Sequence, residues 1–178
     1  MRFGVVLRAI NVARHNRVRM DTLRGAVSEA GFRDVRSHLQ SGNLTLDTDE
    51  TAASLVVERL EGVMLDLGLR GASVVARPWS DIERLATQAP FTGYATSEHM
   101  FTVSFCRAAI PDPPTAPWTE RGVIFLGGSA WALFAVVPRD AARLPNPNAI
   151  IERRWGIPAT TRFWNVVTDW VSREMTPR

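Results

Sequence analysis

The chain has 178 residues, 46% of them hydrophobic, and a formal net charge of +3. This composition supports one packed domain or two small ones, and no apolar run approaches the roughly 18 residues of a membrane-spanning helix. No signal peptide is visible before the first strand, so we expect a cytoplasmic protein with no membrane partner. The single cysteine, Cys106, excludes an internal disulfide, and its position within a strand favours an inert buried thiol.

Positive charge is concentrated at the amino-terminal end. All 21 basic residues are arginine. Residues 1–40 contain eight arginines and three acidic residues, whereas residues 41–100 contain four arginines and nine acidic residues. We therefore look for a site for anions in the first forty residues rather than for a basic surface over the whole protein.

Residues 5–20 begin as a strand and continue into a basic loop. Residues 3–8 place apolar side chains on both faces of the strand, which indicates that both faces are covered. No acidic residue occurs before Asp21, and the loop contains Asn11, Arg14, His15, Asn16, Arg17 and Arg19. A helix follows, and Gly31 fits the position just beyond its end.

The first half of the chain predicts the order strand, helix, strand, strand, helix, strand. After the first helix we expect a strand over residues 35–39, a turn over 40–43 and a returning strand over 44–47. Thr48 or Asp49 fits the cap of the next helix, Gly68 its end, and residues 72–76 a fourth strand. This order is typical of the ferredoxin-like split βαβ pattern, and it predicts the third strand antiparallel between the first and the second.

The second half predicts further helices and strands. Ser80 and Glu83 fit a capping box for a helix over residues 81–88, and residues 100–106 alternate as a strand. Four prolines make residues 110–117 an extended connection. We expect a hairpin around Gly127-Gly128, a helix from Asn146-Pro147 to about residue 156, and a last helix capped by Thr160 or Thr161.

We therefore predict an α+β fold in two parts. Residues 1–78 form a ferredoxin-like subdomain, and it packs against a second, smaller α+β subdomain, residues 79–178.

The predicted topology gathers polar residues at one edge of the first sheet. Parallel first and second strands would end there, beside the turn at 40–43 and the start of the first helix. The side chains expected at this edge are Arg8, Asn11, Arg14, His15, His38, Gln40, Ser41 and Asn43. Guanidinium groups beside a helix amino terminus suit an anion. A solvated basic loop, whose arginine stems cover apolar surface, is the alternative interpretation.

Other chemistries find weaker support. The three histidines lack metal-ligand spacing, so we predict no metal and no cofactor. Ser41 would need a strand-to-helix turn to act as the nucleophile of a nucleophile elbow, but its turn joins two strands. RNA-binding modules share the predicted element order, yet the strand over 44–47 lacks their stacking aromatic residues.

Five stretches match the motifs of a known family. They read LRAINV followed by VRM, then QSGNL, APF and PATTRFWNVVT. They resemble the uncharacterised bacterial family called domain of unknown function 1697, whose members typically contain LRGINVGG, VxM, QSGNV, NPF and ATxRNWNTV. The resemblance runs nearly end to end. It implies a two-part α+β fold with a ferredoxin-like first half, and it implies no activity.

The residues that match the polar motifs of this family overlap the predicted edge. They are Arg8, Asn11, Gln40, Ser41, Gly42 and Asn43, together with Arg162, Trp164 and Asn165 near the carboxyl end. The sequence departs from the family at Ala9, which replaces a glycine, at Ala13-Arg14, which replaces a Gly-Gly pair, and at Phe163, which replaces an asparagine. The loop is therefore stiffer and more basic than in other members.

From these patterns we predict a protein that binds a polar or anionic small ligand at the edge formed by the loop over residues 8–20 and the turn over 40–43. One alternative is an enzyme acting on a phosphorylated or nucleotide-like substrate at the same edge. Another is contact between the arginine loop and nucleic acid. A homodimer through a sheet edge is compatible with the sequence. The candidate ligand-binding residues are Arg8, Asn11, Arg14, Gln40, Ser41, Gly42, Asn43, Arg162, Trp164 and Asn165.

Overall fold

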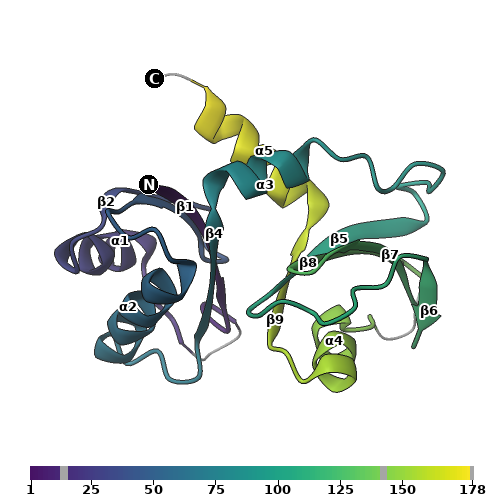
Figure 1. Ribbon diagram of the computed structural model, residues 1–178, viewed down its shortest axis with the longest axis horizontal. Coiled ribbons are helices and arrows are strands. Elements are labelled where there is room, and N and C mark those ends of the chain that lie inside the picture. The colour runs from purple at the N-terminus through teal and green to yellow at the C-terminus, as the bar shows by residue number, and fades with distance from the viewer. Residues whose placement is uncertain (13–15, 141–143, 177–178) are drawn as a thin grey trace. The chain divides into compact units, whose positions relative to one another are not determined.

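The fold is α+β, as the sequence predicts, and it contains two antiparallel sheets. A computed structural model describes residues 1–12, 16–140 and 144–176. The chain forms two compact units, Met1–Leu85 and Ala86–Arg178. Figure 1 shows that each unit has its own sheet and its own helices. The domain limit at residue 78 stays a prediction.

The first unit follows the predicted element order. Its sheet has the strand order β2-β3-β1-β4, and all neighbouring strands are antiparallel. The predicted place of the third strand, antiparallel between the first and the second, is confirmed, and the arrangement is compatible with the ferredoxin-like pattern. The elements are β1 (Arg2–Arg8), α1 (Met20–Glu29), β2 (Arg33–His38), β3 (Asn43–Asp47), α2 (Ala53–Asp66), β4 (Ser73–Pro78) and α3 (Trp79–Ala86).

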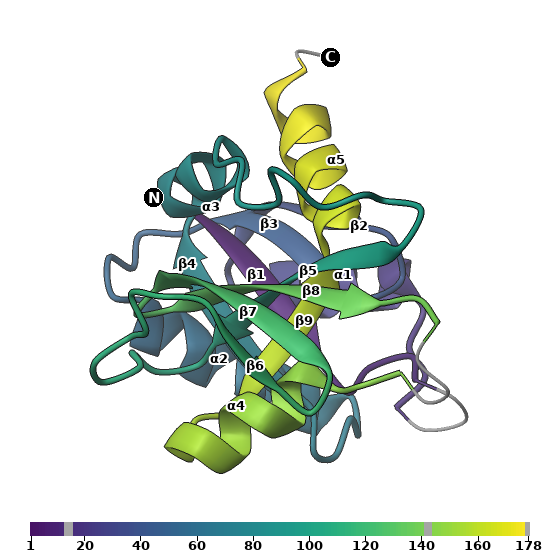
Figure 2. The same ribbon diagram turned by 90° about the vertical axis from the view of Figure 1, so that its right-hand side faces the viewer.

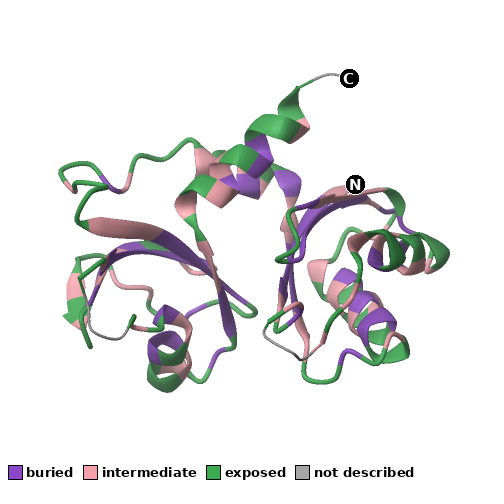
Figure 3. Cartoon of the chain, turned by 180° about the vertical axis from the view of Figure 1, so that it is seen from behind, coloured by how far each residue is buried: buried purple, intermediate pink, exposed green. Residues whose placement is uncertain are grey.

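One face of this sheet packs against α1 and α2, which lie together on that side in Figure 1. Alternate residues of β1, such as Val5, point to this core, where they meet Leu23 of α1 and Leu60 of α2. Val6 points to the opposite face and is only 1% exposed, so β1 is buried on both faces, as predicted. Figure 3 shows the same pattern, with buried residues along β1 and an alternation of buried and exposed residues on the helices.

Two predicted helix caps in this unit are wrong. Neither Thr48 nor Asp49 caps α2, because the helix begins later, at Ala53, and Ala52 occupies its cap position. The capping box of Ser80 and Glu83 does not form either, because α3 already begins at Trp79. Glu83 instead accepts a hydrogen bond from the indole Nε1 of Trp79, at 2.7 Å.

The second unit has a five-stranded sheet in the order β6-β7-β8-β5-β9, which Figure 2 shows nearly face on. Its sheet has one strand more than that of the first unit, and the prediction of a second α+β unit is confirmed. One face packs against α4 through a core that includes the buried thiol of Cys106. The elements are β5 (His99–Cys106), β6 (Trp118–Glu120), β7 (Val123–Ser129), β8 (Ala132–Pro138), α4 (Pro147–Trp155), β9 (Ala159–Phe163) and α5 (Trp164–Met175).

Two short strands explain why the sequence underestimated this sheet. β6 follows the proline-rich connection and has only three residues. β9 was predicted to be a helix start at Thr160 or Thr161, but Thr161 pairs with Ser104 of β5, and α5 begins only at Trp164. The β-branched residues therefore extend the sheet, a choice that depends on a partner strand far away in the sequence.

The glycine pair predicted as a hairpin turn lies inside β7 instead. The register between β7 and β8 shifts between Phe125 and Gly127, as at a bulge. A Cβ atom on Gly128 would lie 2.1 Å from the backbone oxygen of Ala132. The pair thus permits a close approach of two strands, and the turn follows two residues later.

The predicted start of α4 is confirmed. The Asn146 side chain accepts a hydrogen bond from the backbone N–H of Asn148, at 3.0 Å, and Pro147 occupies the first turn. Gly156, with φ of 68°, ends the helix in the left-handed conformation. Within the part of the chain that the structure describes, no helix is long and apolar enough to cross a membrane.

Candidate functional site

Two loops of the first unit meet beside the amino end of α1. The end of β1 and the loop after it each donate a hydrogen bond to the turn between β2 and β3. The backbone N–H of Leu7 donates to the carbonyl oxygen of Gly42, at 2.7 Å. The side-chain Nδ2 of Asn11 donates to the carbonyl oxygen of Gln40, at 3.0 Å.

Asn11 organises the loop after β1. Its backbone N–H donates to the carbonyl oxygen of Asn16, at 2.9 Å, and its Oδ1 accepts from the N–H of Val18, also at 2.9 Å. Asn16 in turn donates from Nδ2 to the carbonyl oxygens of Ala9 and Arg70, each at 2.8 Å. The side-chain amides of Asn11 and Asn16 form hydrogen bonds with backbone groups that lie outside the helices and strands. These bonds fix the described parts of the loop, residues 9–12 and 16–18.

The turn over residues 40–43 is held by its own residues. Gly42 has φ of 77°, and a Cβ atom there would lie 2.6 Å from Cδ1 of Ile10 and 2.7 Å from Cβ of Leu7. Only glycine fits both the backbone conformation and the space. Asn43 is fully buried and donates to the carbonyl oxygen of His38, at 3.0 Å, and to Oγ of Ser41, at 3.1 Å.

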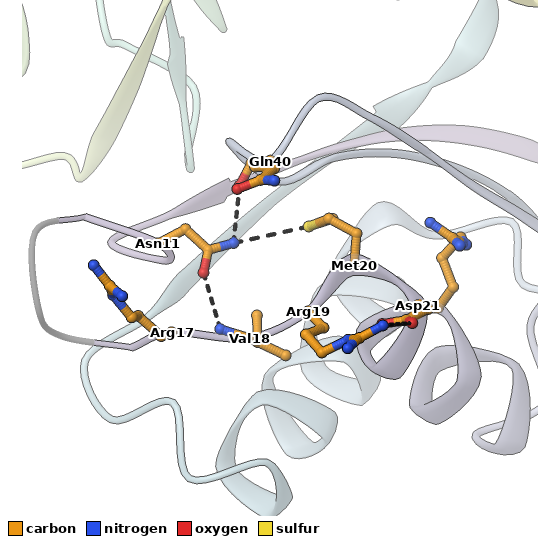
Figure 4. A pocket seen from close by; sticks show the side chains of 8 residues that line it. Asn11, Arg17, Val18, Arg19, Met20, Asp21 and Gln40 are labelled. Atoms are coloured by element: carbon orange, nitrogen blue, oxygen red, sulfur yellow. Dashed lines mark hydrogen bonds and ion pairs between the residues drawn. The ribbon is translucent and has the colours of Figure 1, made fainter.

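A depression of about 760 Å³ opens between the loop, the turn and the amino end of α1. Figure 4 shows Asn11 at its centre, bonded to Gln40 and Val18, with Arg17 and Arg19 along the loop. The residues that line it are Asn11, Arg17, Val18, Arg19, Met20, Asp21, Arg24 and Gln40.

The lining carries three guanidinium groups and one carboxylate. Arg19 and Asp21 form an ion pair, with Nη2 and Oδ2 2.8 Å apart. The hydrogen bond from Arg19, and then that from the backbone N–H of Thr22, lower the pKa of Asp21 to about 2. Asp21 is therefore ionised at neutral pH and is a weak proton acceptor. Arg24 donates from Nη1 to Oγ of Ser37, at 2.6 Å, which orients its guanidinium group.

The amino end of α1 adds to the positive potential. Arg19 occupies the cap position, and its side chain makes no cap bond, whereas Oδ1 of Asp21 accepts a hydrogen bond from the first-turn N–H of Thr22, at 2.8 Å. The positive end of the helix dipole attracts anions, so it acts in the same sense as the guanidinium groups beside it.

Backbone strain is concentrated in these two loops. Ala9, Asn11, Asn16 and Leu39 have positive φ values of 60°, 52°, 50° and 58°. Asparagine tolerates this conformation, but alanine and leucine adopt it at a cost of about 1 kcal/mol or more each. Such strained residues cluster at ligand sites more often than elsewhere.

The family model described as protein of unknown function (DUF1697) matches residues 1–121. The chain belongs to this family. Its structure is similar to that of the bacterial protein SP0830 from Streptococcus pneumoniae, with a TM-score of 0.64 and 17% identity over 96% of this chain and 98% of that one. At this identity the likeness shows the fold alone. No curated protein matches the chain.

The DUF1697 motif residues do not all reach the depression. Asn11 and Gln40 line it, whereas Gly42 and Asn43 are buried and shape the turn. Arg8 pairs with Ser73 of β4 and is not among the lining residues. It alternates with Leu7, whose side chain packs into the core with the helices, so Arg8 points to the other face of the sheet. Arg14 and His15 lie outside the described residues.

Six lining residues were not among the predicted site residues: Arg17, Val18, Arg19, Met20, Asp21 and Arg24. Arg17 and Arg19 belong to the arginine run that the sequence analysis identified, but the choice among its arginines depends on which way each side chain points. Arg24 lies four residues after Met20, on the same side of α1. Helical spacing from the helix start was the signal that could have found it.

The three carboxyl-terminal motif residues belong to the second unit. Arg162 donates from Nη1 to Oγ1 of Thr160 and to the carbonyl oxygen of Thr161, each at 3.0 Å. Burial lowers the pKa of Arg162 to about 10, so its guanidinium group remains charged at neutral pH. Trp164 and Asn165 begin α5 and line a separate cavity of that unit.

The depression offers polar groups whose places in the structure can be stated one by one. Ser41 lies in a strand-to-strand turn, where its hydroxyl accepts a hydrogen bond from Asn43. Across the described residues, no group of three or more His, Cys, Asp or Glu side chains is placed to hold a metal ion. The depression presents positive charge, amide groups and the amino end of a helix, which together suit an anion.

Proposed function

We propose that this member of the DUF1697 family binds a small, multiply charged anion, such as a phosphorylated metabolite, in the depression at the amino end of α1. The observation that carries the proposal is the lining itself. Arg17, Arg19 and Arg24 line it with a single carboxylate, beside the amino end of α1. The excess positive charge and the positive end of the helix dipole favour the same kind of ligand.

The roles of the arginines differ. Arg19 already has a carboxylate partner in Asp21, so part of its charge is neutralised. Arg24 bonds through Nη1 to a neutral hydroxyl, that of Ser37, and keeps its full charge. We therefore expect Arg24 to contribute more to the affinity for an anion than Arg19 does.

Asn11 would act as a positioning residue. Its side chain uses Nδ2 on the turn and Oδ1 on Val18, so it fixes the distance between the two walls of the depression. Replacing it would alter the shape of the site without removing a charge. The backbone strain at Ala9 and Leu39 supports a ligand site at these two loops. Strained residues persist only where the surrounding structure fixes them, and they cluster at ligand sites.

The test is a thermal-shift and calorimetric titration of the full chain with pyrophosphate and with adenosine triphosphate at low and moderate salt. A ligand at about 100 times its dissociation constant stabilises a protein by about 2.7 kcal/mol. We expect Arg24→Gln to weaken binding about tenfold, the effect of one charge-assisted hydrogen bond.

The matched control is Arg33→Gln, which removes the same charge from the start of β2. Arg33 is exposed and pairs with Asp49, outside the depression. Equal affinities in Arg24→Gln and Arg33→Gln would contradict the proposed site. A short RNA oligonucleotide forms a further arm of the titration. If RNA binds with a steep salt dependence while the small anions do not bind, the loop contacts nucleic acid instead.

A further inference from the structure

The second unit contains a cavity of about 470 Å³. Its size lies within the range of about 300–1,000 Å³ that is usual for small-molecule sites. Its walls come from the start of β5 and the segment before it, from the residue after β8, from the end of β9 and from the start of α5. The lining residues are Thr96, His99, Met100, Phe101, Arg139, Phe163, Trp164, Asn165 and Thr168.

Aromatic rings supply much of the wall, and some of them are held in place. Phe101 stacks on Phe91, with ring centroids 4.5 Å apart and planes 4° apart. Trp164 meets Phe91 and Phe134 edge to face, at 5.6 Å and 5.5 Å. Because the neighbouring rings fix Phe101 and Trp164, these walls are already formed without a ligand.

Phe163 is the exposed wall of the cavity. It is 51% exposed, an unusual position for a phenylalanine, and it stands where the DUF1697 motif usually has asparagine. An apolar ring at this position adds a surface against which a flat ligand can pack.

A single charged side chain lines this aromatic cavity. Arg139 donates from Nε to the carbonyl oxygens of Thr96, at 2.9 Å, and His99, at 3.2 Å. These bonds fix the guanidinium group through one nitrogen. Among the described residues these two are the hydrogen bonds of the Arg139 side chain, and neither uses an Nη group, so both Nη groups remain for an anion. No acidic residue lines the cavity to compete for them.

The first turn of α5 adds a neutral polar group. Thr168 donates from Oγ1 to the backbone oxygens of Trp164 and Asn165, at 3.3 Å and 3.2 Å. These bonds do not use the side-chain amide of Asn165, which is exposed at the cavity. The amide can therefore donate to an oxygen or nitrogen at the rim of a ring.

We propose that this cavity binds a planar aromatic carboxylate. The ring would pack against Phe101, Phe163 and Trp164, and the carboxylate would accept hydrogen bonds from the Nη groups of Arg139. Charge complementarity selects the anion, because the one charged lining group is cationic, and the aromatic walls select the flat ring. The site lies in the second unit and does not depend on the anion site proposed for the first unit.

The test uses indole-3-acetate as the probe and indole-3-acetamide as its uncharged counterpart. Each is titrated into the ¹⁵N-labelled full chain, and the indole N–H signals of the tryptophans are followed, with Trp164→Phe identifying the signal of Trp164. We expect a saturable shift of the Trp164 signal with the carboxylate and weaker binding of the amide.

Two variants separate recognition of the carboxylate from recognition of the ring. Arg139→Gln should weaken binding of the carboxylate about tenfold and leave the amide unchanged. Phe163→Ser should weaken both probes, and it should fold normally because Phe163 is half exposed. The matched control is Arg153→Gln, which removes an exposed charge from the last turn of α4.

The proposal is overturned if indole-3-acetate gives no saturable shift at millimolar concentration, or if Arg139→Gln binds it as well as Arg153→Gln does. Arg24→Gln, in the first unit, should not alter this binding. A change there would show that the probe binds the basic depression instead.

Discussion

The depression of the first unit and the cavity of the second unit are built by opposite means. The depression has walls of loop backbone, held by the amide groups of Asn11 and Asn16 and by positive φ values. The cavity has walls of aromatic side chains, held by stacking against Phe91 and Phe134. Charge dominates the first, whereas ring surface with one arginine dominates the second.

The two kinds of wall predict different sensitivities to substitution. Hydrogen bonds to buried or strained backbone have few substitutes, since the lost partner leaves a polar group unsatisfied. In a cluster of packed rings, a change in the shape of one ring can be accommodated in part by its neighbours. We therefore expect the depression to depend on individual glycine and asparagine residues and the cavity to depend on its rings together.

The largest expected effect is that of Gly42→Ala. The added Cβ atom would clash with Ile10 and Leu7, and alanine would be strained at φ of 77°. We expect the free energy of unfolding to fall by about 2–4 kcal/mol, measured by urea denaturation.

Gly25→Ala is the matched control for this substitution. Gly25 lies in α1, with open space around it, so alanine should stabilise the protein by about 0.5–1 kcal/mol. If Gly42→Ala matched this gain, the close contact of the two loops would not exist in solution.

A smaller effect is expected from Asn43→Ala. Its side-chain bonds to the carbonyl oxygen of His38 and to Ser41 are lost in a fully buried place, at a cost of about 1–3 kcal/mol. Asn165→Ala, at the exposed rim of the cavity, should change the free energy of unfolding by less than about 0.5 kcal/mol. Equal losses in urea denaturation would remove the proposed contrast between the two regions.

The smallest expected effect is on anion affinity in Asp21→Asn. Arg19 keeps the pKa of Asp21 at about 2, so its carboxylate is charged at every pH above about 4 and opposes an anion throughout that range. We expect Asp21→Asn to raise the affinity for sulfate about twofold to fivefold, equally between about pH 5 and pH 8, in calorimetric titrations.

Asp21→Asn should raise the anion affinity but lower the free energy of unfolding. A carboxyl whose pKa is lowered on folding contributes stability that is present above its unfolded value, 3.8, and is lost as the pH falls toward about 2. Asp21→Asn should therefore reduce stability at neutral pH but not in strong acid. Asp66→Asn, an exposed carboxylate at the end of α2, is the control for charge loss alone. A strong pH dependence of the affinity gain between about pH 5 and pH 8 would contradict the low pKa of Asp21.

The predicted helix caps show which helix starts can be predicted from local sequence. Asn146-Pro147 marks a helix start correctly, because the cap bond closes within three residues. Thr160 and Thr161 fit a cap equally well by sequence, yet they pair with β5. Cap residues are also good strand or turn residues, so the choice depends on whether a distant strand is available as a partner.

The candidate site shows the same division. Sequence pointed to the arginine loop and to the turn over residues 40–43, and Asn11 and Gln40 of these segments line the depression. The sequence did not predict the direction of each side chain. Arg8 points to the opposite face of the sheet, and Arg24 of α1 lines the depression instead. A shift of one residue along a strand reverses the face, so small differences in register decide which arginine is available.

The sequence by itself determined the α+β class, the element order of the first unit, the family and the basic loop, because periodicity, turn residues and charge act over a few neighbouring residues. Tertiary structure alone decided the role of Gly42, whose neighbours Leu7 and Ile10 are remote in the chain. It also decided the aromatic cavity, which joins Thr96 to Thr168. Such contacts are set by the packing of whole elements, and local patterns do not encode them.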